Sequence, residues 1–596
     1  MNKLLFILSA AFLLIFTACK QTKEPIAKND GWKQLTLREK IGQTMMVTGN
    51  YKEHLKIGND TLEQFFEKYP IGAFFMAQWH FFDPKSPDNL YEDFIPLLMK
   101  KYADASPRPL FFSEDFERGA GYERDAGFSN PNPMPWQQDT VRGAGYTNAT
   151  KLPVEMALGA ANNTGLAYAY SQIMAQESRA MGFNWLLNPV ADLNMNPLHP
   201  LVIERSISDN VERALPILQA QTRAMKDHGV ISTIKHFPGD GATICDQHLI
   251  PSANNLSLNE WKKTFGKVFQ TMIDEGVPSI MVGHLQFPAY QNDAIDGVLP
   301  PATLSKDIMT KLLKQEMGYK GVVISDAMNM GGASGFYGNA LEASVQCFIA
   351  GADMILWPSL AYMDTVEARI LRGEISMKRL DDAVERIWAL RETYDLLEKK
   401  SSITTPLPEN HAEFVQTKMA QLANEAITLI QNKGNVIPFD TATVKKIMLI
   451  NLSHNDHRKE FKILKKELLE RGFDEVRLVH DFHRNEWGWK WDTAVLPYDK
   501  YIVCFENHYF KPIGSPLLKD REAYALWAIK DLPKEKVISI SFSNPYYNTF
   551  YLKQTPVLIN AYSSDEFMQQ AAARLLMGEI KATATSPVNL YNPVMR

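Results

Sequence analysis

Short apolar segments with strand character alternate with amphipathic helical segments along most of this 596-residue chain. Gly, Pro and Asn bound the strand-like segments, and the helical ones repeat with a period near ~3.6 residues. Strands that alternate with helices form a parallel sheet covered by those helices. The first set of expected strands lies at 72–78, 110–115, 184–193, 230–237, 279–287, 321–328 and 351–358. The helices expected between or after them lie at 164–181, 209–228, 257–276, 305–317 and 377–396.

These strands are apolar on both faces, and polar residues gather where they end. Burial on both faces and active-site groups at the carboxyl ends of strands are typical of a (β/α)8 barrel. We therefore expect an α/β fold in which residues 31–400 form a TIM-like catalytic barrel. A doubly wound open sheet is the alternative that the pattern leaves open.

A second, smaller α/β domain is expected after a break in the pattern. Residues 401–412 are polar, contain proline and lack periodicity, as an interdomain linker does. We expect residues 413–596 to form an α/β sandwich domain that starts with a helix at 413–431. Further helices are expected at 457–472, 516–531 and 564–579, and strands at 445–452, 475–482, 500–507, 536–543 and 556–563.

Composition argues against several classes of function. Lys and Arg number 63 against 68 Asp and Glu, so the net charge is -5, and the basic excess of a nucleic-acid-binding surface is missing. No P-loop or dinucleotide glycine motif is present. Cys245, Cys347 and Cys504 are too few and too scattered for a disulfide framework or a zinc site, and we expect buried thiols.

The N-terminus predicts export. Lys3 precedes the apolar run Leu4–Phe16, which is shorter than the roughly 20 residues that cross a bilayer as a helix. Residues 1–18 are therefore expected to be a signal peptide. Small residues before Cys19 resemble a bacterial lipobox, which predicts lipidation of Cys19, a tether at 19–30 and attachment in the cell envelope, with Lys20 favouring the outer membrane. An ordinary signal peptide with a chance cysteine is the alternative.

Four polar segments stand where strands are expected to end: 111–119, 204–206, 235–241 and 324–328. Each has a structural explanation on its own, since Asp115 or Asp326 could cap a turn or a helix, and Arg205 could pair with Glu204. Acids and bases that converge on one end of a barrel would instead form a pocket with ionisable walls. Their combination indicates an active site.

At these segments the sequence resembles glycoside hydrolase family 3, and most closely its β-N-acetylglucosaminidase branch. Lys235-His236-Phe237-Pro238-Gly239-Asp240-Gly241, followed by Asp246-Gln247-His248, is similar to the most specific motif of that branch. The segment 321–330 resembles the strand that carries the family's nucleophile, and 423–432 resembles the start of its appended α/β sandwich domain. The resemblance covers nearly the whole chain after residue 18.

The resemblance implies an exo-acting, retaining β-N-acetylglucosaminidase that acts on a carbohydrate without a metal or organic cofactor. It makes Asp326 the nucleophile. His248, on a loop, would be the acid/base, and Asp246 would orient its imidazole. Sugar-binding positions of the family match Asp115, Arg205, Lys235 and His236.

The sequence departs from the family pattern at three places. Asp115-Phe116-Glu117-Arg118-Gly119 stands where Asp-Gln-Glu-Gly-Gly is common, Asp240 replaces a histidine, and only Arg124 could match an arginine that follows the first motif. Two alternatives stay open. One is a family 3 β-glucosidase with a glutamate acid/base, for which Glu506 is the candidate; the other is a catalytically inactive carbohydrate-binding lipoprotein.

Overall fold

The computed structural model describes the chain from Asp30 to Tyr591 with gaps. The signal peptide, Cys19 and Arg124 lie outside the described residues. Within the described part, no helix is both long enough and apolar enough to cross a membrane. The described ranges are 30–49, 61–76, 91–121, 149–398, 402–453, 461–479, 484–485, 488–489, 497–506, 517–518, 525–527 and 529–591.

Eight parallel strands form the first sheet, which confirms the expected barrel. They pair in the order β10-β1-β2-β3-β4-β5-β7-β9, and a parallel bridge from Ile324 to Met354 links the last strand to the first. The strands are β1 (Met45–Thr48), β2 (Ala73–Phe75), β3 (Phe111–Glu114), β4 (Trp185–Leu186), β5 (Ile231–Phe237), β7 (Ser279–Val282), β9 (Val322–Ser325) and β10 (Ile355–Leu356).

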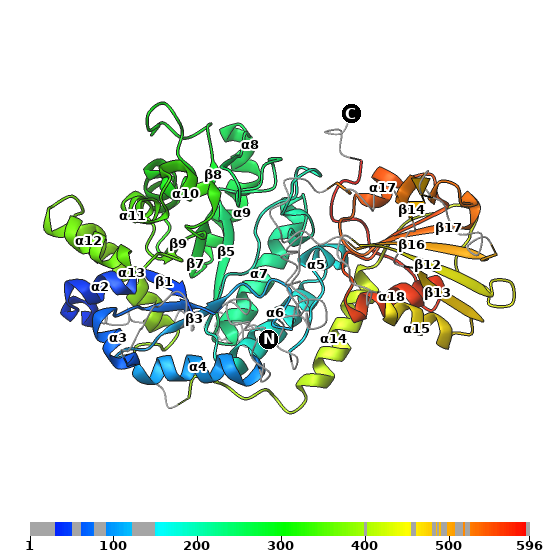
Figure 1. Cartoon of the computed structure of the whole chain (residues 1–596), viewed down its shortest axis with the longest axis horizontal. Helices are drawn as coiled ribbons and strands as arrows, with labels where there is room; N and C mark the ends of the chain where they lie inside the picture. Colours follow the sequence, from blue (N-terminus) through cyan, green and yellow to red (C-terminus); the bar gives the residue numbers. More distant parts are fainter. Residues whose placement is uncertain are drawn as a thin grey trace, which may run out of the picture.

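Helices surround the barrel (Figure 1). The predicted helix at 164–181 is confirmed at both ends, because the Asn163 side chain caps its first N–H groups and Gly182 ends it at positive φ. The predicted helix at 257–276 is instead two helices that meet at Thr264. The helical elements are η1 (Asp30–Gln34), α2 (Leu37–Gln43), α3 (Leu62–Lys68), α4 (Tyr91–Ala105), α5 (Glu155–Ala161), α6 (Thr164–Met181), η4 (Ile203–Arg205), α7 (Val211–Asp227), α8 (Leu258–Lys263), α9 (Phe265–Asp274), η5 (Ala302–Leu304), η6 (Asp307–Glu316), α10 (Gly331–Tyr337), α11 (Ala340–Ala350), α12 (Ala361–Leu371) and α13 (Met377–Thr393).

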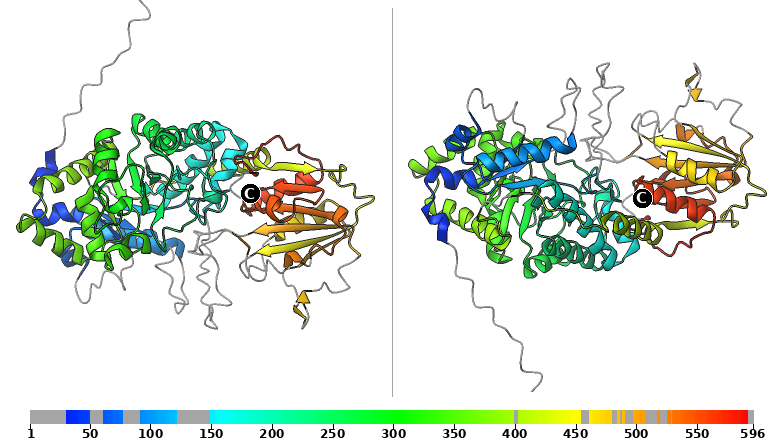
Figure 2. Two further views of the ribbon diagram at one scale, coloured as in Figure 1. Left: turned by 90° about the horizontal axis from the view of Figure 1, so that it is seen from above. Right: turned by 90° about the horizontal axis from the view of Figure 1, so that it is seen from below.

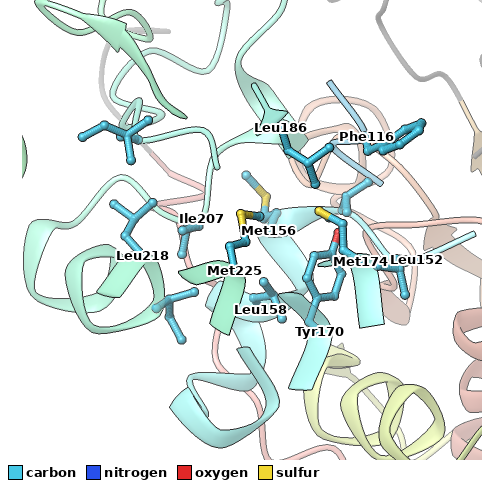
Figure 3. Close-up of a cluster of buried hydrophobic side chains, with 14 of the residues drawn as sticks. Phe116, Leu152, Met156, Leu158, Tyr170, Met174, Leu186, Ile207, Leu218 and Met225 are labelled. Atoms are coloured by element: carbon cyan, nitrogen blue, oxygen red, sulfur yellow. The ribbon is translucent and has the colours of Figure 1, made fainter. Parts of the chain in front are cut away.

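Alternation along each strand separates two apolar cores. Met46 points into the barrel, where it shares a cluster with Phe111 and Trp185, whereas its neighbours Met45 and Val47 belong to the layer under the helices. Figure 3 shows part of this outer layer, including Phe116 and Leu186. Large side chains fill the barrel, so its chemistry is confined to its ends.

Arg391 of α13 closes the end of the barrel at which the strands begin. Its guanidinium donates to Gln43 Oε1 (2.9 Å) before β1, to Gly72 O (3.0 Å) before β2 and to Pro109 O (2.6 Å) before β3. It also lies over the Phe111 ring, 4.1 Å from the centroid. Arg391 is only 2% exposed, and burial lowers the pKa of its guanidinium to about 9.

The second domain is built on a six-stranded sheet in the order β11-β18-β17-β16-β12-β13, in which only the β11 edge is antiparallel. The predicted helix at 413–431 is wrong in its last turn, because it ends at Ala426 and Thr428–Asn432 pair with β18 as a strand. The elements are α14 (His411–Ala426), β11 (Thr428–Asn432), β12 (Lys446–Ser453), α15 (Lys462–Glu470), β13 (Glu475–Val479), β16 (Lys500–Glu506), η8 (Lys534–Lys536), β17 (Val537–Ser541), α17 (Tyr547–Tyr551), β18 (Val557–Asn560) and α18 (Glu566–Leu576).

The barrel and the second domain lie side by side along the long axis of the molecule (Figure 2). Helix α14 packs against α5 and α6 of the barrel, and Asn163 Nδ2 donates to Glu425 Oε2 there (2.9 Å). Two short pairs stand apart from both large sheets: β6 (Ser252–Ala253) with β8 (Leu285–Gln286), and β14 (Arg484–Asn485) with β15 (Gly488–Trp489).

Arg391→Met should lower the free energy of unfolding by about 3 kcal/mol, because Gln43 Oε1 and the carbonyls of Gly72 and Pro109 would each lose a hydrogen bond from the guanidinium while the aliphatic volume stays. Urea unfolding followed by fluorescence measures this change. Arg372→Met is the control, since Arg372 is exposed and pairs with its neighbour Glu374, and it should change stability little. Equal effects of both substitutions would contradict the role of Arg391 in closing the barrel.

Candidate active site

All four predicted polar segments contribute to one site at the carboxyl end of the barrel, and three of them stand at strand ends. Asp115 follows β3 directly, and Asp326 follows β9 directly. Lys235 and His236 lie near the carboxyl end of β5. Arg205 does not end a strand, as its segment was expected to do. It lies on the short helix η4, in the long connection from β4 to α7.

Asp326 is a buried carboxylate, 9% exposed, in a positive environment. Its Oδ1 accepts a hydrogen bond from the N–H of Ala327 (2.7 Å). Burial alone would raise the pKa of this carboxyl, but nearby histidines and the Ala327 N–H outweigh burial and hold the pKa below its ordinary value. Asp326 is therefore ionised at neutral pH, as a nucleophile must be. The histidines are His236, His284 and His248.

His236 faces this carboxylate and is held from behind. Its Nε2 is 3.9 Å from Asp326 Oδ2, while its Nδ1 donates to Asp192 Oδ2 (2.6 Å). The backbone N–H of His236 donates to the other oxygen of Asp192 (3.1 Å). Asp192 thus fixes both the ring and the backbone of the residue that faces Asp326.

His248 and Asp246 form a pair, as the sequence predicted. Asp246 Oδ1 accepts from both the ring Nδ1 and the backbone N–H of His248, each at 2.9 Å. The His248 side chain is 37% exposed, whereas that of Asp246 is 1% exposed. The imidazole is therefore oriented through Nδ1, and its Nε2 can exchange a proton with a bound molecule.

The loop that carries this pair is attached to the barrel near Asp326. Gln247 Oε1 accepts from the N–H of His284 (2.7 Å), and the N–H groups of Gly331 and Gly332 donate to the carbonyls of His248 (2.8 Å) and Gln247 (3.1 Å). A Cβ on either glycine would clash with this loop backbone. Since α10 begins at Gly331, five residues after Asp326, the two proposed catalytic groups share a short structural connection.

A second group of charges surrounds Glu117. Its carboxylate accepts two hydrogen bonds from Arg205 at 2.7 Å and lies 2.7 Å from Lys235 Nζ. Lys235 also donates to Asp115 (2.8 Å). Burial opposes ionisation of Glu117, but Arg205 and Lys235 hold the pKa of its carboxyl well below its usual range. Asp115, 20% exposed, is left as the most accessible acid of this group.

Asp240 belongs to a buried network behind the site. It accepts from His199 Nε2 (2.7 Å), and its N–H donates to Asp192 Oδ1 (2.7 Å). His199 Nδ1 in turn accepts from the N–H groups of Leu201 and Val202. The ring therefore carries its proton on Nε2 and pairs with Asp240 as a donor.

Sequence reasoning missed Asp192, Glu117 and His284 as parts of the site. Asp192 and His284 lie just beyond the strand cores of segments that were recognised, so a polar residue in an apolar segment was the available signal. Glu117 was visible within the first motif, but its two cationic partners are 88 and 118 positions away, and only the fold brings them together. The described residues include no group of His, Cys, Asp or Glu that could hold a metal ion.

Residues 123–390 match the description "Glycosyl hydrolase family 3 N terminal domain". A protein of Cellulomonas fimi named β-N-acetylglucosaminidase/β-glucosidase is 27% identical over 470 residues, which are 74% of this chain and 81% of that protein. Beta-hexosaminidase A of Pseudoalteromonas piscicida is 32% identical over 323 residues, 50% of this chain and 53% of that protein. The chain thus spans only about half the length of the second relative.

Two solved structures share the fold. A family 3 β-N-acetylglucosaminidase from Paenibacillus sp. str. FPU-7 has a TM-score of 0.74 and 26% identity, and the match covers 93% of this chain and 99% of that one. A β-glucoside phosphorylase has a TM-score of 0.78 at 24% identity, over 95% and 96% of the two chains, which supports the two-domain architecture alone. Both matches include the barrel and the second domain.

Glu155 should make stability depend on pH. It is fully buried beside Glu117, and burial followed by the Glu117 charge raises its pKa from 4.5 to about 8. The folded protein therefore holds a proton there that the unfolded chain releases above pH 4.5, so this stabilisation is complete below pH 4.5 and is lost as pH rises to about 8. Glu155→Gln should flatten the fall of Tm over this range.

Scanning calorimetry at several pH values compares the wild type with Glu155→Gln. Glu470→Gln, at an exposed position of α15, is the matched control and should keep the wild-type slope. Parallel curves for Glu155→Gln and the wild type would show that Glu155 does not hold this proton.

Proposed function

We propose that this chain is an exo-acting, retaining β-N-acetylglucosaminidase, since residues 123–390 match the N-terminal domain of glycosyl hydrolase family 3. The observation that carries this proposal is the His248–Asp246 pair on a loop attached beside the buried, ionised Asp326. A nucleophilic carboxylate and a group that gives and then takes a proton are the two requirements of retaining hydrolysis.

In the first step, an Asp326 oxygen attacks the anomeric carbon and the bond to the leaving oxygen breaks. His248 donates its Nε2 proton to that oxygen, while its Nδ1 proton stays on the hydrogen bond to Asp246. In the second step, neutral His248 takes a proton from water, and the water oxygen displaces Asp326 from the anomeric carbon. Two inversions return the β configuration.

The charges around Glu117 suit the sugar. Asp115 can accept from sugar hydroxyls, and Lys235, Arg205 and His236 can donate to sugar oxygens. Since Glu117 already binds Arg205 with two hydrogen bonds, both cations are held in place before substrate enters. Because these side chains are already in position, less of the free energy of substrate binding is lost in ordering them.

The preference for N-acetylglucosamine is supported by the names of relatives with a similar chain, one of which also includes β-glucosidase. The alternative acid/base, Glu506, is 4% exposed and accepts from Ser564 within the second domain (3.2 Å). Unlike His248, it is not on an exposed loop, so we favour the histidine.

The 4-nitrophenyl β-N-acetylglucosaminide should be cleaved with a kcat/KM about 100-fold above that of the β-glucoside, a difference of roughly 2.7 kcal/mol in transition-state binding. Initial rates on both substrates measure this ratio, and proton NMR identifies the first anomer, which should be β. Asp326→Asn is the inactive control at nearly constant volume. Preference for the glucoside would support the β-glucosidase alternative, and an α-anomer would exclude the mechanism.

His248→Ala should slow substrates with poor leaving groups by at least ~100-fold, and activated aryl glycosides much less, because only the former need proton donation. The kcat for chitobiose compared with that for 2,4-dinitrophenyl N-acetylglucosaminide measures the effect. His228→Ala is a control that should change neither rate, because His228 follows the last residue of α7, before β5 begins, away from the carboxyl end of the barrel. Equal losses on the two substrates would contradict an acid role for His248.

We also propose that the mature protein is anchored in the bacterial cell envelope through lipidated Cys19, with its catalytic domain outside the cytoplasm. The support is the sequence before Cys19 alone. Cys19→Ser should move the protein from the membrane fraction to the soluble fraction, as immunoblotting of fractionated cells can show. Full retention of the variant in membranes would exclude this anchor.

A further inference from the structure

We propose that the second domain is a positioning part of the sugar-binding subsite, because it holds two barrel loops that carry the sugar-binding residues. This inference rests on the proposed function for what those residues bind. The two loops are 115–121, after β3, and 187–208, after β4. Each is joined to the second domain by a side-chain hydrogen bond.

The first contact is made by Arg118, where the family pattern has glycine. Arg118 is 2% exposed, and its Nη2 donates to Ser563 Oγ of the second domain (2.8 Å). An arginine in place of glycine adds a long side chain, and the fold uses that length to reach across the domain boundary. The departure from the family motif thus corresponds to an interdomain contact.

The same loop holds the centre of the charge cluster. Arg118 directly follows Glu117, whose side chain binds Arg205 and Lys235. The carbonyl of Arg118 accepts from the N–H of Leu152 (2.8 Å), and that of Glu117 accepts from Tyr170 OH (3.2 Å). Leu152 and Tyr170 belong to the buried layer drawn in Figure 3. The loop backbone is therefore held from the barrel side, and its outer side is held by Ser563.

The second contact involves Asn194, whose Nδ2 donates to Tyr546 OH (3.4 Å). The Asn194 N–H donates to Ser206 Oγ (3.1 Å), and this hydroxyl donates to the carbonyl of Asp192 (2.6 Å). Asp192 orients His236, and Ser206 follows Arg205. A series of hydrogen bonds thus connects Tyr546 to Ser206 and Asp192, which adjoin or contact these two sugar-binding residues. Ser208 of this loop also donates to the carbonyl of Pro587.

The anchoring residues of the second domain are themselves fixed. Ser563 is fully buried and precedes Asp565, whose Oδ1 caps α18 by accepting from the N–H groups of Phe567 (3.0 Å) and Met568 (3.1 Å). Tyr546 is 1% exposed and stacks on Phe550, with ring centroids 5.6 Å apart. Because Ser563 and Tyr546 are held rigidly, they can fix the positions of the two barrel loops, which long and mobile surface side chains could not do.

The decisive variants are Ser563→Ala and Tyr546→Phe, since each removes one oxygen and adds no bulk. Glu425→Ala is the matched control, because it also removes an interdomain hydrogen bond. Its partner, Asn163, caps the start of α6 and belongs to neither loop. Ser563→Thr keeps the hydroxyl and should restore the wild-type behaviour.

With the aryl glycoside that the wild type cleaves best, Ser563→Ala should raise KM about tenfold with a smaller change in kcat, and Tyr546→Phe should act in the same direction. Glu425→Ala should leave both constants within about twofold of the wild type, although it should lower Tm about as much as Ser563→Ala does. A KM for Ser563→Ala equal to that of Glu425→Ala would overturn the proposal.

Hydrogen exchange separates this proposal from the proposed function. Amide exchange should become faster over 115–121 in Ser563→Ala and over 187–208 in Tyr546→Phe, whether or not the protein cleaves N-acetylglucosaminides. Unchanged exchange in both loops would overturn the positioning role. Faster exchange in these variants, together with a wild type that hydrolyses no glycoside, would overturn the proposed function alone.

Discussion

The pairing of Glu117 with Arg205 and Lys235 is the interaction on which the rest of the site depends. Two cations cannot be buried together at the end of an apolar barrel unless a carboxylate compensates them, because desolvation and mutual repulsion would otherwise push their charges apart or remove them. With Glu117 between them, Arg205 is fixed by two hydrogen bonds, and Lys235 fixes the end of β5. His236 is the next residue, and it reaches Asp326 from there. The charged groups of the site are thus connected, either by direct contact or, for Lys235 and His236, by adjacent positions in the chain.

The sequence predicted what local patterns can encode. Alternating apolar segments indicated the barrel, a period of about 3.6 residues located the helix at 164–181, and one continuous motif contained both His248 and Asp246. It could not predict partners that only folding brings together. Asp192 and His236 are 44 positions apart, and although Asp192 is a polar residue in an apolar segment, nothing in the sequence identifies His236 as its partner. The end of the helix predicted at 413–431 was missed for a related reason, since Thr428–Asn432 become a strand only because β18 offers them an edge.

The position of the second domain also bears on how the two acid/base candidates differ. Glu506 ends β16 and pairs with Ser564, next to the Ser563 that binds Arg118. The carboxyl edge of the second sheet therefore faces the barrel loops, as expected for an α/β sheet whose functional groups lie beyond the ends of its strands. In this chain Ser563, at the carboxyl edge of the second sheet, donates no proton to substrate in our proposal but holds the loop of Arg118 by a hydrogen bond. The residue that we propose for proton transfer is His248 of the barrel.

The contacts of Arg391 join parts of the barrel that are synthesised at different times. The guanidinium that satisfies the starts of β1, β2 and β3 is separated from Pro109 by 282 positions, and from Gln43 by 348. A ribosome that adds roughly 5–20 residues per second needs on the order of 15 to 60 seconds to travel from Pro109 to Arg391. Throughout that interval Gln43 Oε1 and the carbonyls of Gly72 and Pro109 lack the donor that Arg391 supplies. The contacts that join the starts of β1, β2 and β3 to α13 therefore form only after almost the whole barrel has been synthesised.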